Sequence, residues 1–206
     1  MRGTELQLLR HGLPEGGGGR YRGNGVDDPL STEGLVQMWT AVAGSGPWDR
    51  IVSSPLRRCQ EFARALSHDL RCPLIVEPRI REVGLGAWEG RRKDEIEAET
   101  PGSIAAFRAD PVRHRPPGAE PLEAFCRRTA EAARDLAANH PGERLLVVTH
   151  AGVIRALVAM ALDLPLPSLY RVAVDHAGCT LLHHREGTWS LRYHNRRAPP
   201  PPSPGG

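Results

Sequence analysis

The chain has 206 residues, of which 40% are hydrophobic and 25% charged, and its formal net charge at pH 7 is +3. This composition is ordinary for a folded globular domain and excludes a disordered chain, a fibrous repeat and a coiled coil. No apolar stretch approaches the ~18 residues of a membrane span, and the first residues lack the pattern of a signal peptide. We therefore expect one cytoplasmic domain with no membrane partner.

The basic residues and the cysteines carry little sign of further binding functions. Lys93 is the only lysine and the arginines are scattered, so no basic block indicates a nucleic-acid partner. No two cysteines have C-x-x-C spacing, and adjacent His183 and His184 would point to opposite faces of a strand rather than share a zinc ion. We expect reduced, buried thiols and no metal site; the cysteines are Cys59, Cys72, Cys126 and Cys179.

The first half of the chain alternates short apolar runs with helical patterns. The expected elements, in order, are a strand at 4–9, a loop at 13–29 around Gly16 to Gly19, a helix to 43 capped by Ser31, a strand at 49–53, a helix from Pro55 to 70 and a strand at 74–76.

The second half begins with an irregular, glycine-containing segment and ends with strands. The expected elements are a loop at 82–89, short helices at 93–99 and 104–108, an amphipathic helix at 122–139, a buried strand at 145–149, a helix at 152–164, and short strands at 170–174, 180–184 and 189–194. The proline- and glycine-rich residues 198–206 are expected to be a disordered tail.

Alternating strands and helices predict an α/β fold: a three-layer sandwich with a mostly parallel central sheet and helices on both faces. Such sheets bind ligands beyond the carboxyl ends of their strands. Polar segments follow three predicted strands, at Arg10-His11-Gly12, at Ser53-Ser54 with Arg57-Arg58 beyond, and at 149–152. We expect these segments to converge.

Glycine-rich nucleotide loops are absent. A Walker A loop needs Gly-Lys-Ser/Thr, and the only lysine lies in Arg92-Lys93-Asp94. The G-x-G-x-x-G pattern fails because Tyr21, Arg22 and Glu89 stand where its third glycine would be.

The converging side chains fit chemistry on a phosphate group. The arginines Arg10 and Arg58 match phosphoryl oxygens, and the helix that would begin after His150 offers backbone N–H groups to an anion. A histidine among them can attack phosphorus, and Glu82 can protonate a leaving alkoxide. The pattern is typical of metal-free phosphoryl transfer, although each residue alone is more often a structural group.

Four motifs resemble those of the histidine phosphatase superfamily, whose members have the phosphoglycerate-mutase-like fold. The first three are Leu8 to Gly12, with Arg-His-Gly at a strand end, Ser53 to Ala63 around Arg58, and Ile80 to Gly90, with Glu82 and W-E-G. The fourth is Val148 to Arg155, around the second histidine. The resemblance implies a single domain over 1–197, with a cap within about 82–140.

The resemblance also implies the role of each residue. His11 would be the catalytic nucleophile, and Arg10, Arg58 and His150 would bind the phosphoryl group with it. Glu82 would be the general acid and then the base that activates water. His150 would be protonated beside the phosphate dianion. No cofactor is implied, and the expected partner is a small phosphate ester.

The loop after Arg-His-Gly departs from the family pattern. Leu13-Pro14-Glu15 and four glycines stand where members often carry a hydroxyl residue and then an asparagine. Backbone N–H groups of Gly16 to Gly19 would replace those side chains as phosphate ligands, or the loop has no ligand role.

Within the superfamily, the short separation of Glu82 from His150 favours phosphatases over mutases. Residues 22–30, 48–56, 109–111 and 116–121 resemble α-ribazole phosphatases, which implies α-ribazole 5′-phosphate or adenosylcobalamin 5′-phosphate as substrate in cobalamin biosynthesis. The alternatives are a broad-specificity sugar or nucleotide phosphatase, a phosphoglycerate mutase-like enzyme, and, in another class, a non-catalytic phosphate-binding regulatory module. A further alternative is an interaction protein that binds its partners through the proline tail.

Overall fold

The computed structural model describes residues 2–197, so the predicted tail at 198–206 lies outside the described residues. Within this range the strands form a six-stranded sheet in the order β3-β2-β4-β1-β5-β6. β4 pairs in parallel with β1 and β2, and β2 with β3, whereas β5 is antiparallel to β1 and to β6. The strands are β1 (Thr4–Arg10), β2 (Arg50–Ser53), β3 (Leu74–Val76), β4 (Arg144–Thr149), β5 (Cys179–Arg185) and β6 (Thr188–Arg196).

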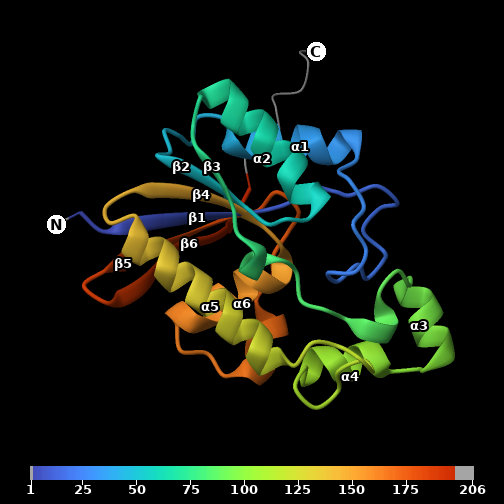
Figure 1. Cartoon of the computed structure of the whole chain (residues 1–206). Coiled ribbons are helices and arrows are strands. Elements are labelled where there is room, and N and C mark those ends of the chain that lie inside the picture. The colour runs from blue at the N-terminus through green and yellow to red at the C-terminus, as the bar shows by residue number, and fades with distance from the viewer. Residues whose placement is uncertain (1, 198–206) are drawn as a thin grey trace, which may run out of the picture.

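Helices cover both faces of the sheet, which confirms the expected three layers. α1 and α2 lie on one face and α5 and α6 on the other, while α3 and α4 lie to one side (Figure 1). The helices are α1 (Thr32–Val42), α2 (Arg57–Leu70), α3 (Lys93–Glu99), α4 (Ser103–Ala109), α5 (Leu122–Asn139) and α6 (Ala151–Ala161), with 3₁₀ turns η1 (Pro78–Ile80), η2 (Gly86–Trp88) and η3 (Leu166–Arg171). No helix among residues 2–197 is long and apolar enough to cross a membrane.

The strand side chains divide between two cores. In β4, Leu145 and Val147 join the core beneath α5 and α6, whereas Leu146 and Val148 join the core beneath α1 and α2. Successive side chains of a strand point to opposite faces. The sequence of a strand that is buried on both faces is therefore an unbroken apolar run, such as Leu-Leu-Val-Val at 145–148.

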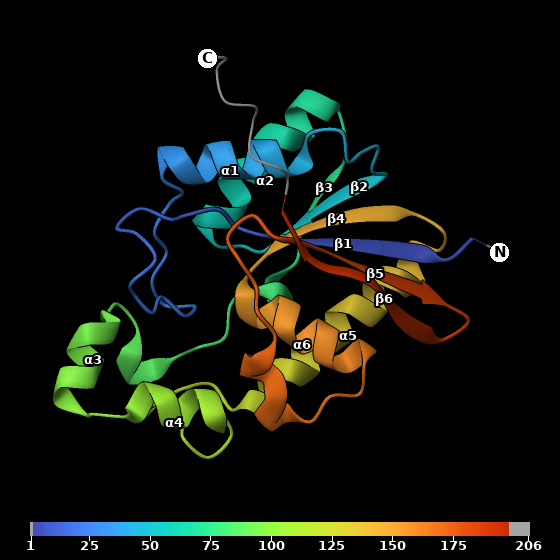
Figure 2. The same ribbon diagram turned by 180° about the vertical axis from the view of Figure 1, so that it is seen from behind.

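The loop after β1 packs against the segment that leads into α3 (Figure 2). The N–H of Tyr21 donates to the carbonyl of Arg91 (2.9 Å), and that of Lys93 donates to Gly19 (3.0 Å). The carboxylate of Glu89 accepts the N–H of Asn24 at 3.1 Å and touches Gly23, where a Cβ would lie 1.9 Å from it. Gly23 is thus required by this contact and by its φ of 56°.

Three predicted elements differ from the structure. The helix expected at 152–164 ends at Ala161. The helix expected from Pro55 begins at Arg57, because the carboxylate of Asp27 accepts the Arg57 N–H at 2.7 Å and so supplies the cap from the loop. The strand expected at 170–174 does not form. Side chains take its carbonyls instead: Arg155 donates to Val172 O (2.9 Å) and Arg10 to Val174 O (2.7 Å).

The cap of α1 gives a testable contribution to stability. The hydroxyl of Ser31 accepts the N–H of Gly34 (3.0 Å) and donates to the carbonyl of Leu13 (2.8 Å). We expect Ser31→Ala to lower the free energy of unfolding by about 1–2 kcal/mol, measured by urea denaturation. Ser103→Ala is the control, because the buried Ser103 hydroxyl has no partner among the described residues. Equal effects of the two substitutions would contradict the capping role.

Candidate active site at the carboxyl ends of β1, β2 and β4

The predicted convergence at the strand ends is confirmed. His11, Ser54 and His150 directly follow β1, β2 and β4, which are neighbours in the sheet. The N–H of His11 donates to Thr149 O (2.9 Å) and that of Ser54 to Val148 O (3.0 Å). Parallel pairing therefore continues past the strand ends and sets the three polar side chains at one level.

A cavity of about 330 Å³ opens at this edge of the sheet. Four predicted site residues line it: Arg10, His11, Arg58 and Glu82. The fifth, His150, is fully buried and lies outside the lining, with its ring centroid 5.2 Å from that of His11. Among the described lining residues Glu82 is the only carboxylate, against seven basic side chains: Arg10, Arg20, Arg22, Arg58, Lys93, Arg108 and Arg155.

The ring of His11 is held in the tautomer that a nucleophile needs. Its Nδ1 lies 2.8 Å from the carbonyl oxygen of Gly12, which can only accept, so Nδ1 carries the proton. Burial, then the charges of Arg58 and Arg10, lower the pKa of His11 well below its usual value. At neutral pH the ring is therefore uncharged, and Nε2 has a free lone pair.

The two arginines are fixed by backbone carbonyls, and both retain a free donor. Arg58, only 1% exposed, donates to the carbonyls of Gly23 and Val26, each at 2.9 Å. Arg10 donates to Val174 O, and burial lowers its pKa to about 10, so it stays charged at neutral pH. The Nε of each is buried without a partner among the described residues. An oxyanion in the cavity would satisfy donors of this kind.

The structure places the two neighbouring arginines differently. Arg57 is exposed and pairs with Glu61 on the surface of α2, whereas Arg58 enters the cavity. In the glycine run only Gly18 lines the cavity, so a phosphate contact by Gly16 to Gly19 stays a prediction.

His150 is held behind His11 by buried polar contacts. Its Nε2 lies 2.7 Å from the hydroxyl of Ser54 and 3.6 Å from Sγ of Cys59. Burial, then Arg58, His11 and Arg10, lower the pKa of His150 well below its usual value. The ligand-free histidine is therefore neutral, and the expected protonation requires the negative charge of a bound phosphoryl group.

The carboxylate of Glu82 is held by two backbone N–H groups. It accepts from Val83 at 2.9 Å and from Gly152, in the first turn of α6, at 3.3 Å. A Cβ on Gly152 would lie 2.2 Å from Oε1 of Glu82. The glycine of the H-A-G motif is therefore what allows the acid to reach the start of α6.

Two side chains of the site were missed by the sequence analysis. His176 lines the cavity, with its Nε2 2.8 Å from Nη2 of Arg10 and its ring centroid 5.7 Å from that of His11. Arg22 pairs with Asp28 at 2.8 Å and donates to the carbonyl of Gly17. Both lie in irregular segments, so no strand-end or helical pattern marks them.

Three further cations line the cavity from other elements: Lys93 of α3, Arg108 of α4 and Arg155 of α6. The Arg155 guanidinium lies 5.0 Å from the ring centroid of Tyr170. None of the three has an ion-pair partner within residues 2–197. The sequence marks only one of the three as unusual, because Lys93 is the only lysine in an arginine-rich chain.

The arrangement can bind a phosphate dianion and attack it. Guanidinium groups flank a neutral imidazole with a free Nε2, and one carboxyl group lies in the same cavity. These are the parts of nucleophilic catalysis with acid–base assistance. Among residues 2–197 no three His, Cys, Asp or Glu side chains gather as ligands of a metal ion.

Comparison with known proteins gives consistent results over nearly the whole chain. The family model described as histidine phosphatase superfamily (branch 1) matches residues 6–197. The adenosylcobalamin/alpha-ribazole phosphatase of Salmonella typhimurium is 31% identical over 196 residues, covering 94% of this chain and 96% of that protein. A metal-independent phosphoserine phosphatase of Arabidopsis thaliana is 31% identical over 160 residues, covering 75% and 67%.

A solved structure agrees with the fold. The mycobacterial glucosyl-3-phosphoglycerate phosphatase in complex with VO3 superimposes with a TM-score of 0.84 at 32% identity, covering 93% of this chain and 98% of that one. The proteins named in these comparisons share a phosphatase name and differ in the substrate that the name gives.

The buried neutral histidines predict how stability depends on pH. The pKa values of His11, His150 and His176 lie below the unfolded value of about 6.5, and that of His176 is lowered to about 4. Below pH 6.5 the unfolded chain therefore binds more protons than the native protein does. We expect the free energy of unfolding to fall by about 1.4 kcal/mol per histidine and pH unit as the pH drops from 6.5 to 5.

Urea unfolding of the ligand-free protein at pH 7.5, 6 and 5 measures this slope. His176→Gln keeps an acceptor for Arg10 and should reduce the slope by the share of one histidine. Unfolding free energies that do not change between pH 7 and 5 would show that the native histidines bind protons as readily as the unfolded ones, and that their pKa values are not lowered.

Proposed function

The chain belongs to the histidine phosphatase superfamily (branch 1) and is a phosphatase; from that premise we propose that it hydrolyses phosphate monoesters through a phosphohistidine on His11, without a metal ion. The observation that carries the proposal is the orientation of His11: Nδ1 is committed to the Gly12 carbonyl, so Nε2 is left as a neutral nucleophile in a cationic cavity.

In the first step the phosphoryl group binds between Arg10 and Arg58, whose guanidinium N–H groups donate to its oxygens. The Nε2 lone pair of His11 forms a bond to phosphorus while the bond from phosphorus to the ester oxygen breaks. The electron pair of that bond goes to the ester oxygen, which takes a proton from the carboxyl group of Glu82. The fixed guanidinium groups stabilise the transferring phosphoryl group.

In the second step a water molecule attacks the phosphohistidine. The carboxylate of Glu82 accepts the water proton, the bond from phosphorus to Nε2 breaks, and inorganic phosphate leaves. Throughout, the Gly12 carbonyl holds the proton on Nδ1. Protonation of His150, made favourable by the bound dianion, would add positive charge beside His11.

For the substrate we propose α-ribazole 5′-phosphate or adenosylcobalamin 5′-phosphate, in cobalamin biosynthesis. The support is the end-to-end similarity to proteins of that name, together with the resemblance of the loop and cap segments. In the fold, Gly18 and residues 20–23 of the loop after β1 line the cavity with Lys93 of α3, where they would contact the leaving group.

A second candidate is a phosphate ester whose leaving group carries its own acidic group. Lys93, Arg108 and Arg155 line the cavity in addition to the arginines that serve the phosphoryl group, and none of the three forms an ion pair within the described residues. A related structure bears the name of an enzyme for glucosyl-3-phosphoglycerate, which contains a carboxylate. A carboxylate or second phosphate on the leaving group would complement these three cations.

The substrate proposal is tested by phosphate release from α-ribazole 5′-phosphate, 3-phosphoglycerate and p-nitrophenyl phosphate in EDTA. We expect a kcat/KM for the ribazole ester at least about 10-fold above the others. A kcat/KM for 3-phosphoglycerate above those for the other two esters would support the second candidate instead. Similar slow rates on all three esters would indicate a broad-specificity phosphatase, and activity that needs added metal would contradict the mechanism.

The nucleophile is tested by His11→Ala. Without Nε2 no covalent intermediate forms, and we expect kcat/KM to fall by several orders of magnitude with the fold retained. His68→Ala is the matched control because His68 is exposed on α2, and the activity of this variant should be unchanged. Substantial turnover by well-folded His11→Ala would rule out the assignment.

A further inference from the structure

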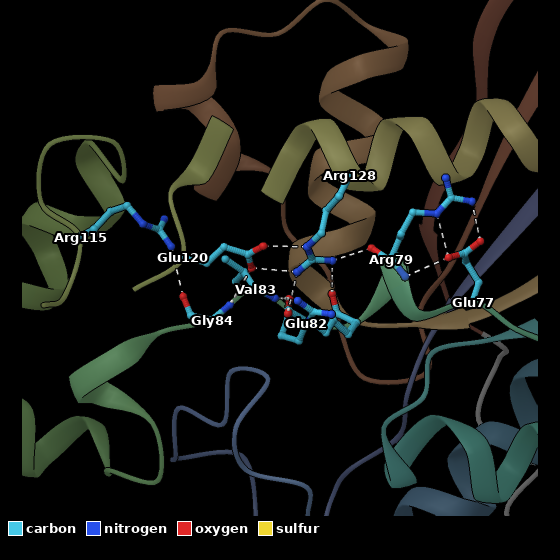
Figure 3. A network of polar contacts seen from close by, with 9 residues as sticks. Glu77, Arg79, Glu82, Val83, Gly84, Arg115, Glu120 and Arg128 are labelled. Carbon is cyan, nitrogen blue, oxygen red and sulfur yellow. Dashed lines mark hydrogen bonds and ion pairs between the residues drawn. The ribbon is translucent and has the colours of Figure 1, made fainter. Parts of the chain in front are cut away.

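Arg128, in α5, makes an unusual set of contacts with the segment that carries the acid. Its Nη1 donates to the carbonyls of Arg79 (2.5 Å) and Arg81 (3.0 Å), and its Nη2 donates to the carbonyl of Glu82 (3.1 Å). One guanidinium group thus binds three carbonyls on the N-terminal side of Glu82 and at Glu82 itself (Figure 3).

Glu120, just before α5, completes this arrangement. Its carboxylate accepts from Nε and Nη2 of Arg128 in a bidentate pair at 2.7 and 2.8 Å. The same carboxylate accepts the N–H of Gly84 at 3.1 Å, and the Glu120 N–H donates to the carbonyl of Gly84 at 3.0 Å. The pair therefore holds the backbone on both sides of Glu82.

The contacts of Arg128 and Glu120 matter because the segment around Glu82 has no regular secondary structure to hold it. Residues 81–85 belong to no helix or strand, and the carbonyls of Arg81 and Glu82 have no other donor within the described residues. The Arg128 side chain is only 15% exposed and that of Glu120 18%, so both bonds are largely shielded from water. Arg128 also lies over Phe125, 4.7 Å from its ring centroid.

We propose that Arg128 and Glu120 are a positioning pair that places the Glu82 carboxyl group at the leaving oxygen. The inference rests on the proposed function, in which Glu82 gives its proton to that oxygen. Neither member of the pair lines the cavity. Their effect on the reaction passes through the backbone of residues 79–84, and a displacement of about 1 Å there is enough to weaken proton transfer.

Leaving-group dependence separates this role from general support of the fold. A poor leaving group such as the alkoxide of glycerol 3-phosphate needs the proton, whereas p-nitrophenolate departs without it. The comparison uses kcat/KM, which reports the steps only up to formation of the phosphohistidine and so excludes the part of Glu82 as base in the second step. In Arg128→Met, which keeps a side chain over Phe125 but removes every donor, we expect kcat/KM for glycerol 3-phosphate to fall about 10- to 100-fold. With p-nitrophenyl phosphate we expect a change of less than about 3-fold.

Two more variants complete the experiment. Glu120→Gln, which keeps the shape and one oxygen acceptor, should show the same selectivity to a smaller extent. Arg127→Met is the matched control, because Arg127 is the exposed neighbour of Arg128 on α5, and it should leave kcat/KM for both esters unchanged.

Glu82→Gln distinguishes failure of this inference from failure of the proposed function. If Glu82→Gln lowers kcat/KM for both esters equally, Glu82 is not the acid and the proposed function is wrong. If Glu82→Gln shows the selective loss but Arg128→Met slows both esters equally, or neither, the pair is not a positioning device. Failure of both Arg128→Met and Glu120→Gln to fold would make the pair purely structural and overturn the proposal.

Discussion

The whole site depends on two guanidinium groups that are buried beside histidines and form no ion pair with a carboxylate within residues 2–197. Buried charge is costly unless its hydrogen bonds are satisfied. Here backbone carbonyls satisfy part of this requirement: Gly23 and Val26 for Arg58, and Val174 for Arg10. Burial, and then the same positive charge, lowers the pKa of His11, which keeps the nucleophile neutral. The uncompensated charge and the free Nε atoms make the cavity complementary to a phosphoryl dianion, and the chemistry follows from that complementarity.

The fold supplies these positions through parallel pairing and through contacts between loops. β1, β4 and β2 end at one level, so the residues that follow them meet. The loop after β1 brings the carbonyls of Gly23 and Val26 to Arg58, and the Glu89 carboxylate holds the same loop at the N–H of Asn24. On the opposite side the acid is held twice, at its carboxylate by the start of α6 and at its backbone by Arg128. The carboxyl group of Glu82 and the cationic cavity are thereby held in one fixed geometry.

Much of this could be predicted from the sequence, because the decisive residues follow apolar strands or lie in motifs. His11, Arg58 and Glu82 line the cavity as the motifs implied. The residues that sequence reasoning missed act through tertiary contacts that no local pattern encodes: His176 reaches Arg10 from an irregular segment, and Arg128 reaches the acid segment from α5. The strand expected at 170–174 failed for the same reason, since distant side chains take its carbonyls.

The central claim is that His11 carries the phosphoryl group between the two steps. The most direct measurement is rapid quenching of the enzyme with a phosphate ester at alkaline pH, followed by mass spectrometry of its peptides. The account predicts one acid-labile phosphoryl group on His11, formed and lost at rates compatible with turnover and absent in His11→Ala. Turnover with no phosphorylated enzyme at any quench time, or with the phosphoryl group on another residue, would contradict it.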